Sequence, residues 1–322
     1  MKPPTTFIIL FTIVLLAIPV TQAASLGDFQ FYPDNHIWNV PVDNLPVHPM
    51  SATYVSSSFP SSYLYLSTSF PINVVDQSTP KQYLTSIRYP TASDNIPYPI
   101  PAGALYETSG GDISDRHMLI VNPDTNTLYE FFHVHQASDG TWSAYAAQRY
   151  NLSDYALRPD GFVSANAAGV AMAPGLIRYD EVLAGEINHA ILLSLYTSGH
   201  AHVWPAREDG VVNSASYPPL GQRFRLKASF DTSGYSPQAR TILEAMKKYG
   251  VMLSMNSGLD NSWLIYGDDD PRWPADYKLY YELKTVHGSD FEAVDATSLM
   301  INENSGQARI IPIDTPTPTQ RL

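Results

Sequence analysis

Proline is the residue that most constrains the fold of this chain, because 26 prolines are spread through its 322 residues. Together with 21 tyrosines and many Ser/Thr clusters, they cut the sequence into short apolar segments. Between residues 31 and 106 these segments include SSYLYLST, PINVV and IPYPIP, which are typical of edge strands and wrapping loops. Short strands separated by turn residues predict a mainly β protein. A hydrophobic content of 44% is enough for a buried core.

The clearest strand patterns lie in the second half of the chain. Residues 221–231, GQRFRLKASFD, alternate between apolar and polar side chains, and residues 187–196, INHAILLSLY, indicate a central strand covered on both faces. Helices are expected at 236–250 and 274–288, with a hairpin of 251–255 and 262–267 between them. We expect a single domain over residues 25–300, mainly β and similar to a β-sandwich or jelly roll, with a few short helices and an α/β element near the C-terminus.

The two ends of the chain differ from its middle. One lysine, an apolar run from Phe7 to Val20 and small residues up to Ala24 are the layout of a secretory signal, so residues 1–24 are expected to be removed after Ala23 or Ala24. The run is short for a bilayer span, so we expect a secreted or cell-surface protein with no stable membrane span after signal removal. Residues 301–322 are expected to form a tail that is rich in Thr and Pro at its end.

Composition and motifs exclude several classes of function. The formal net charge of -12 argues against a nucleic-acid partner, because phosphate binding needs a basic surface. The chain has no cysteine, which excludes disulfides and thiolate metal sites. It contains no P-loop, G-x-S-x-G, H-E-x-x-H or EF-hand motif, so neither a cofactor nor a metal is predicted.

The densest polar cluster is DRHMLIVNPDTNTLYEFFHVHQ, residues 115–136. If residues 122 and 127 pair around the turn, 119 faces 130 and 117 faces 132, so His117 and Glu130 lie on one face as diagonal neighbours. A histidine beside a carboxylate can hold a proton near neutral pH, as general acid–base catalysis requires. His133 and His135 then lie on the opposite face, where their spacing suits two metal ligands but is more often structural.

Further residues complete the candidate site. His189 is the third catalytic candidate, although a hydrogen-bonded core histidine is the alternative in so apolar a strand. Arg223, Arg225 and Lys227 form a cationic stripe, which predicts either a groove for carboxylated sugars or an ordinary solvated strand face. Arg116 and Trp204 are included as substrate-binding residues. Carboxylate pairs for glycoside hydrolysis are available in 177–187 and 288–295, although the first also fits an exposed helical turn.

Several segments together resemble a group of secreted bacterial and archaeal proteins without an assigned activity. They are DRHMLIVNPDTNTLYE, RPDGFVSANAAGVAMAPGLIRYDEVLAGEINHAILL, VWPAR, GQRFRLKASFD and GSDFEAVD. The likeness runs from about Pro33 to Leu299 and implies an extracellular, single-domain protein. It brings no catalytic residue with it.

A looser likeness to jelly-roll polysaccharide lyases rests on RFRLKASFDTSGY, residues 223–235. Those lyases place a histidine and a tyrosine beside the scissile uronate, which points to His117 or His189 and to Tyr235. Tyr235 is therefore added to the substrate-binding residues. This likeness is an analogy, because fold does not determine function.

The sequence leads to two hypotheses. The first is a secreted protein that binds or cleaves a polysaccharide, or cell-surface glycan, in a groove of a β-sandwich. The alternative is a non-catalytic cell-surface or matrix module that binds glycan or protein. An enzyme is expected to enclose His117, Glu130 and a third polar group in one cleft, whereas a binding module is expected to show an open aromatic surface.

Overall fold

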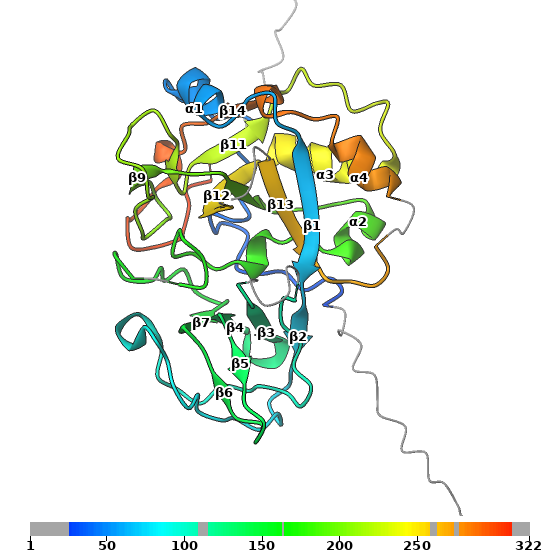
Figure 1. Ribbon diagram of the computed structural model, residues 1–322. Coiled ribbons are helices and arrows are strands. Elements are labelled where there is room, and N and C mark those ends of the chain that lie inside the picture. Colours follow the sequence, from blue (N-terminus) through cyan, green and yellow to red (C-terminus); the bar gives the residue numbers. More distant parts are fainter. Residues whose placement is uncertain (1–25, 109–114, 163, 258–262, 274–276, 311–322) are drawn as a thin grey trace, which may run out of the picture.

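The computed structural model describes residues 26–108, 115–162, 164–257, 263–273 and 277–310, and contains two main sheets (Figure 1). Strands account for 29% and helices for 17% of the residues, so the mainly β prediction is confirmed. The expected signal segment and the end of the Thr/Pro-rich tail lie outside the described residues. Within the described ranges, no helix is both long and apolar enough to cross a membrane.

The larger sheet has six strands in the order β1-β13-β8-β12-β11-β14. β1 pairs with β13 and β8 with β12 in parallel, while the other neighbours are antiparallel. The strands are β1 (Leu64–Phe70), β8 (Ile191–Leu195), β11 (Arg223–Leu226), β12 (Val251–Asn256), β13 (Trp263–Asp268) and β14 (Phe291–Ala293). As the sequence predicted, β8 is central and buried along its whole length.

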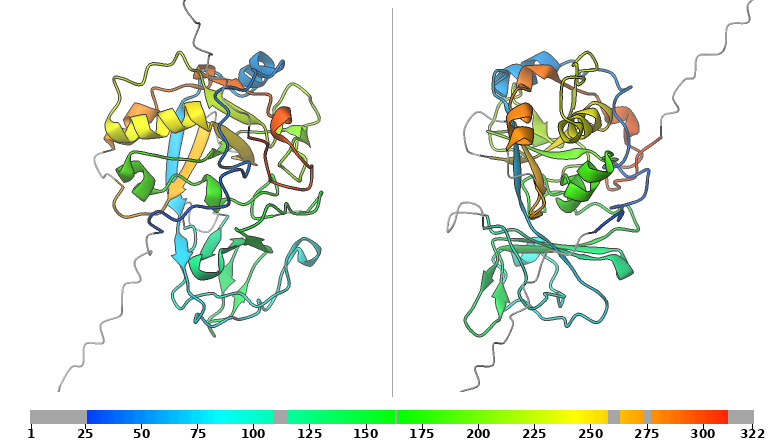
Figure 2. Two further views of the ribbon diagram at one scale, coloured as in Figure 1. Left: turned by 180° about the vertical axis from the view of Figure 1, so that it is seen from behind. Right: turned by 90° about the vertical axis from the view of Figure 1, so that its right-hand side faces the viewer.

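Four helices accompany this sheet: α1 (Ser51–Ser57), α2 (Tyr179–Ala184), α3 (Pro237–Lys248) and α4 (Lys278–Leu283). α2 and α3 lie over one face of the sheet (Figure 2), and α4 packs beside β1. α3 begins where expected, because the Ser236 hydroxyl accepts the N–H of Ala239 and Pro237 occupies the first turn. Its apolar stripe, which includes Ile242, Leu243 and Met246, is fully buried against the sheet.

The prediction of a hairpin between residues 251 and 267 is wrong. β12 and β13 are not paired, because β8 lies between them in the sheet. The most apolar strand of the chain takes the central position, where both of its faces are covered.

The second sheet has four strands in the order β2-β3-β4-β7 and carries the hairpin of residues 115–136. Its strands are β2 (Ile72–Val74), β3 (Met118–Asn122), β4 (Thr127–Phe132) and β7 (Ala146–Asn151). β1 runs into β2 across Pro71 alone, so one extended segment joins the two sheets (Figure 1). Two small pairs complete the strands: β5 (His135–Gln136) with β6 (Trp142–Ser143), and β9 (Gly199–His202) with β10 (Pro219–Leu220).

The two faces of the four-stranded sheet belong to different cores. Leu119, Val121 and Leu128 join the main core beneath the six-stranded sheet. On the other face, a smaller core gathers side chains from the alternate positions and from residues 75–147; it includes Met118, Ile120, Tyr129, Phe131, Val134 and Trp142. The face that carries His117 and Glu130 is therefore an interior face between the two sheets.

Candidate functional site

The register of the β3–β4 hairpin is as the sequence predicted. Asn122 pairs with Thr127 and Leu119 with Glu130. His117 lies one residue before β3, with its ring 5.6 Å from that of Phe132. His117 and Glu130 therefore share a face, as expected, but this face is buried: His117 is 3% exposed and Glu130 is 0% exposed.

His117 is held by oxygen atoms on both sides of its ring. Its Nδ1 lies 2.9 Å from Oε2 of Glu107 and its Nε2 lies 2.8 Å from the carbonyl oxygen of Ala165. Burial alone would lower the pKa of His117, but the hydrogen bond and charge of Glu107 raise it above the usual value of 6.5. Since both ring nitrogens face acceptors, the doubly protonated form satisfies both contacts.

Glu130 is bonded to backbone rather than to another side chain. Its Oε1 accepts the N–H groups of Met172 and Ala173 at 2.8 and 2.9 Å. Burial raises the pKa of Glu130 to about 7, although these N–H groups and His117 act in the opposite direction. The carboxyl group thus fastens residues 172–173 to β4, and neither it nor His117 lines a cavity described below.

His189 lies in a different part of the molecule. Its Nε2 is 3.2 Å from Oε2 of Glu181 and its Nδ1 is 2.8 Å from the carbonyl oxygen of Ala190. In the described residues, no hydrogen bond or ring contact joins it to His117 or Glu130. The structure does not bring the three expected catalytic residues together.

The cationic stripe on β11 serves internal contacts. Arg223 is 2% exposed and donates to the carbonyl oxygens of Tyr249 and Ile37. Arg225 pairs with Glu292 at 2.8 Å and also donates to the carbonyls of residues 42, 43 and 45. Lys227 donates to the carbonyl oxygen of Ser289. These cations hold neighbouring segments against the sheet, so they do not belong to a binding site.

Trp204 and Tyr235 also lie apart from the hairpin. The Trp204 Nε1–H donates to the carbonyl oxygen of Ser305 at 2.8 Å, and its partly buried ring packs against the main core. The Tyr235 hydroxyl is 2.7 Å from Oγ1 of Thr285. Trp204 and Tyr235 therefore both use their polar atoms to hold nearby segments.

The alternation of the hairpin changes at its open end. Arg116 and His133 face each other there, and both have a left-handed backbone, with φ values of 50° and 55°. This shifts the pattern by one residue, because Val134, and not His133, joins Tyr129 and Phe131 in the smaller core. The His133 ring turns outward and lies 4.2 Å from the ring of Tyr145.

A groove with a volume of about 400 Å³ opens beside His133 and is called here the His133 groove. It is lined by Ser86, Ile87, Arg88, Arg116, His133, His135, Ser143, Ala144 and Tyr145. Residues 86–88 reach it because Ile87 bridges to Ala144 and the N–H of Arg88 donates to the carbonyl of Ala144. Of the expected site residues, the groove contains Arg116, together with both histidines of the His-x-His pair.

The His133 groove is cationic and aromatic. The Arg88 guanidinium lies 4.5 Å from the ring centre of Tyr145, and the Arg116 guanidinium lies 4.6 Å from that of Tyr106. Arg116 uses its Nε to donate to the carbonyl of Val134, which leaves its terminal amino groups for a ligand. Across the described ranges neither arginine forms an ion pair, and no Asp or Glu lines the groove.

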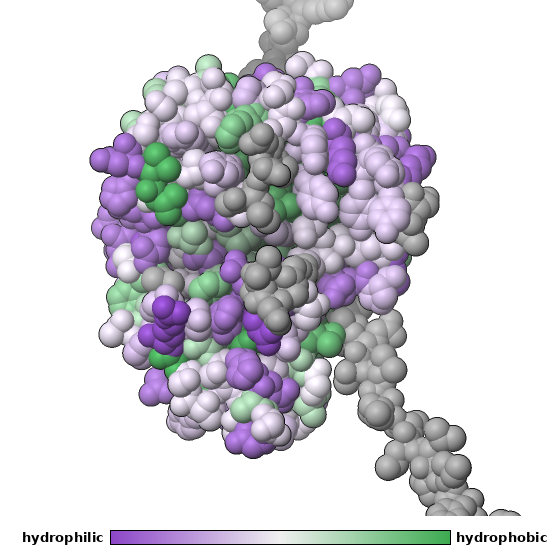
Figure 3. All heavy atoms as spheres, viewed as in Figure 1, coloured by the Kyte–Doolittle hydropathy of each residue, from purple (hydrophilic) through white to green (hydrophobic). Residues whose placement is uncertain are grey.

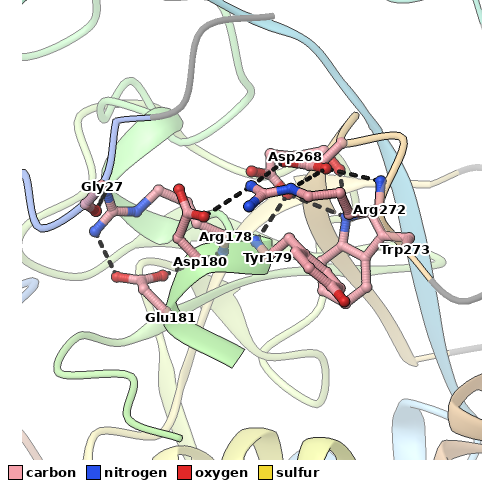
Figure 4. A network of polar contacts seen from close by, with 9 residues as sticks. Gly27, Arg178, Tyr179, Asp180, Glu181, Asp268, Arg272 and Trp273 are labelled. Carbon is pink, nitrogen blue, oxygen red and sulfur yellow. Dashed lines mark hydrogen bonds and ion pairs between the residues drawn. The ribbon is translucent and has the colours of Figure 1, made fainter. Parts of the chain in front are cut away.

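A second cavity, of about 220 Å³, lies beside α2 and contains His189. Its Arg178 bridges the carbonyl of Gly27 and Oε1 of Glu181, as Figure 4 shows. Burial alone would raise the pKa of Glu181, but His189 and Arg178 lower it to about 2. The cations of this cavity are thus already neutralised by a carboxylate, unlike those of the His133 groove.

The contacts around this second cavity extend to the end of β13. Arg272 reaches Asp180 at 2.7 Å, and Asp268 accepts the N–H of Tyr179 and the indole N–H of Trp273 (Figure 4). Burial raises the pKa of Asp268 to about 7. The network joins α2 to residues 268–273, which is a structural role.

Metal ligation has no geometric support in the parts of the chain described. His, Asp and Glu residues there form no group of three or more that could hold a metal ion. Comparison with family models, curated proteins and solved structures gives no match, so the function must be argued from the geometry.

Proposed function

We propose that this protein is a secreted protein that binds carboxylated polysaccharide in the His133 groove. The observation that carries the proposal is the lining of the groove by the described residues: two guanidinium groups without an ion pair, two imidazoles and no carboxylate, on a chain of net charge -12. An acidic protein gains nothing in stability from clustering unpaired cations, so the cluster favours an anionic ligand.

The side chains of the groove match the two parts of a uronate sugar. A guanidinium group binds a carboxylate through two parallel hydrogen bonds. The rings of Tyr145 and His133 offer flat faces on which a sugar ring can stack. The groove is open on one side, which suits a polymer that passes through it rather than a small enclosed ligand.

The proposal does not depend on the jelly-roll arrangement expected from the sequence. Jelly rolls are built from antiparallel strands, whereas β1–β13 and β8–β12 are parallel pairs. The groove lies on the other sheet, at the open end of the β3–β4 hairpin.

Cleavage of the bound polymer by β-elimination is a second candidate function, and the contact between His133 and Tyr145 beside two arginines favours it. A neutral imidazole or a tyrosinate would remove the proton at C5, next to the carboxylate whose charge an arginine neutralises. The C4–O bond then breaks, its former electron pair leaves with the oxygen, which takes up a proton, and a C4=C5 double bond forms. Glycoside hydrolysis is disfavoured because none of the described residues that line the groove is a carboxylate.

The test is affinity gel electrophoresis through polygalacturonate, alginate or hyaluronan, with a neutral glucan as reference. We expect wild type to be retarded by at least one uronate polymer, and Arg88→Ala/Arg116→Ala to lose most of this retardation. The matched control is Arg240→Ala/Arg309→Ala, which removes the same charge from two other exposed arginines. Equal retardation of both double variants would contradict the proposal. For the second candidate function, elimination is detected as a rise in the absorbance of the unsaturated product at about 232 nm.

A further inference from the structure

A cluster of exposed tyrosines lies far from the His133 groove, at the start of β1. Tyr63, Tyr65 and Tyr281 surround the Nζ of Lys284, which lies 5.4, 5.2 and 5.9 Å from their ring centres. The three tyrosines are 43%, 40% and 67% exposed. These four residues are called the Lys284 surface.

The local structure explains why these rings face outward. β1 alternates, so Leu64 and Leu66 enter the main core while Tyr63 and Tyr65 point the other way. Tyr281 is three residues before Lys284 on the outer side of α4, whereas Leu283 is buried. β1 is an edge strand, and none of the described strands pairs with its free side.

The Lys284 ammonium lies near three aromatic rings. In the described part of the chain it forms no hydrogen bond and no ion pair, although Lys278 and Glu282 on the same helix lie 3.8 Å apart. The face over β1 and α4 is coloured pale to purple (Figure 3), as tyrosine and lysine are, and its green areas are small and separate. The surface is therefore a group of flat, amphipathic rings around one unpaired cation, not a broad apolar patch.

We propose that the Lys284 surface is a second binding surface for the same carboxylated polysaccharide, in which sugar rings stack on the tyrosines and a carboxylate meets Lys284. The choice of ligand class rests on the proposed function, whereas the stacking rests on this surface alone. Tyrosine presents a large contact area and loses little conformational entropy on binding, which suits a flexible polymer. β1 begins at the end of the molecule opposite to β5 and β6 (Figure 1), so one long chain would reach both surfaces only by passing along the molecule.

The experiment compares five proteins by affinity electrophoresis and by titration calorimetry with the uronate polymer that retards wild type. They are wild type, Tyr65→Ala/Tyr281→Ala, Lys284→Gln, Arg88→Ala/Arg116→Ala and the control Tyr83→Ala, which removes a tyrosine that is 61% exposed elsewhere. We expect Tyr65→Ala/Tyr281→Ala to weaken binding about tenfold, because two stacking contacts are lost, and Tyr83→Ala to leave it unchanged. Lys284→Gln is expected to weaken binding about threefold and to reduce its dependence on salt.

The outcomes separate the two proposals. If only the arginine variant loses binding, the Lys284 surface is not a binding surface and the proposed function stands. If only the tyrosine variant loses binding, the His133 groove is refuted and the Lys284 surface stands. Loss in both variants supports both, and no binding by wild type to any uronate polymer overturns both. Unchanged melting temperatures of the variants show that the losses do not come from unfolding; this is expected for the exposed tyrosines, and it is the control that the half-buried Arg116 requires.

Discussion

Replacing Glu130 by glutamine tests the account of the interior between the two sheets. Burial raises the pKa of Glu130 from 4.5 to about 7. Below pH 4.5 the carboxyl group is protonated in both the folded and the unfolded state, and above pH 7 it is ionised in both. Between these values only the unfolded state is ionised, so the protein loses stability as the pH rises through this window. At about 1.4 kcal/mol for each pH unit, the loss amounts to about 3 kcal/mol.

Glu130→Gln removes this titration and keeps an oxygen that can accept the N–H groups of Met172 and Ala173. The assay is urea unfolding of both proteins from pH 4.5 to pH 8. We expect the free energy of unfolding of Glu130→Gln, relative to wild type, to increase by about 3 kcal/mol across this range. His117 titrates in both proteins, so the difference between them reports mainly Glu130.

Asp76→Asn is the control, because hydrogen bonds from Ser78 hold the pKa of Asp76 below its usual value of 3.8. The stabilising contribution of Asp76 is present above pH 3.8 and is lost only as the pH falls below this value, so its difference from wild type is expected to stay constant from pH 5 to pH 8. A constant difference for Glu130→Gln as well would refute the conclusion that burial raises the pKa of this carboxyl group.

Three further predictions concern stability and protonation. Gly250→Ala is expected to lower the free energy of unfolding by more than about 3 kcal/mol in thermal or urea unfolding, because φ is +72° and a Cβ would collide with the Phe224 carbonyl. Gly140→Ala, at φ +85° in open space, is expected to lose only about 1 kcal/mol, and equal losses in the two variants would contradict the packing around Gly250. Arg225→Lys is expected to cost about 2 kcal/mol in urea unfolding, since an ammonium cannot reproduce the hydrogen bonds of the guanidinium, and a neutral result would show that these bonds do not hold the segment. The pKa of His117, followed by the ¹⁵N shifts of its ring, is expected to lie above the usual value of 6.5, and a pKa below 6.5 would contradict the effect assigned to Glu107.

The β3–β4 hairpin shows where strand alternation predicts the structure and where it does not. Pairing of Asn122 with Thr127 follows from the turn between them, and this pairing alone places Glu130 opposite Leu119. The prediction fails beyond Phe132, where Arg116 and His133 adopt left-handed backbone conformations. Strand alternation carries no information on such a change, and Arg116 is not among the residues that are enriched in the left-handed region.

Contacts between distant parts of the chain could not be predicted in the same way. The apolar segments at 251–255 and 262–267 are close in sequence, which favours a hairpin, but burial of β8 between them is favoured more strongly. Alternation placed Arg223 and Arg225 on one face, yet carbonyl groups of residues 37–45 cover that face.

The same limit explains why the candidate site was only partly found. Arg116 belongs to the His133 groove, but Arg88 was missed because it lies in a Pro-rich segment without periodicity. It reaches the groove through the pairing of Ile87 with Ala144, a long-range contact without a local pattern. Tyr145 was missed for a similar reason, because its place beside His133 depends on the N–H that it donates to the carbonyl of Phe132.

The most direct test of the central claim is calorimetric titration with a uronate oligosaccharide and with the same oligosaccharide after its carboxyl groups have been reduced to alcohols. Reduction keeps the sugar rings and removes the negative charge, so it tests the interactions with cations, and Arg88→Ala/Arg116→Ala removes those of the His133 groove. We expect wild type to bind the uronate at least tenfold more tightly than the reduced form, and Arg88→Ala/Arg116→Ala to lose most of this preference. Equal affinity of wild type for the two forms would contradict the assignment of the His133 groove as a carboxylate-binding site.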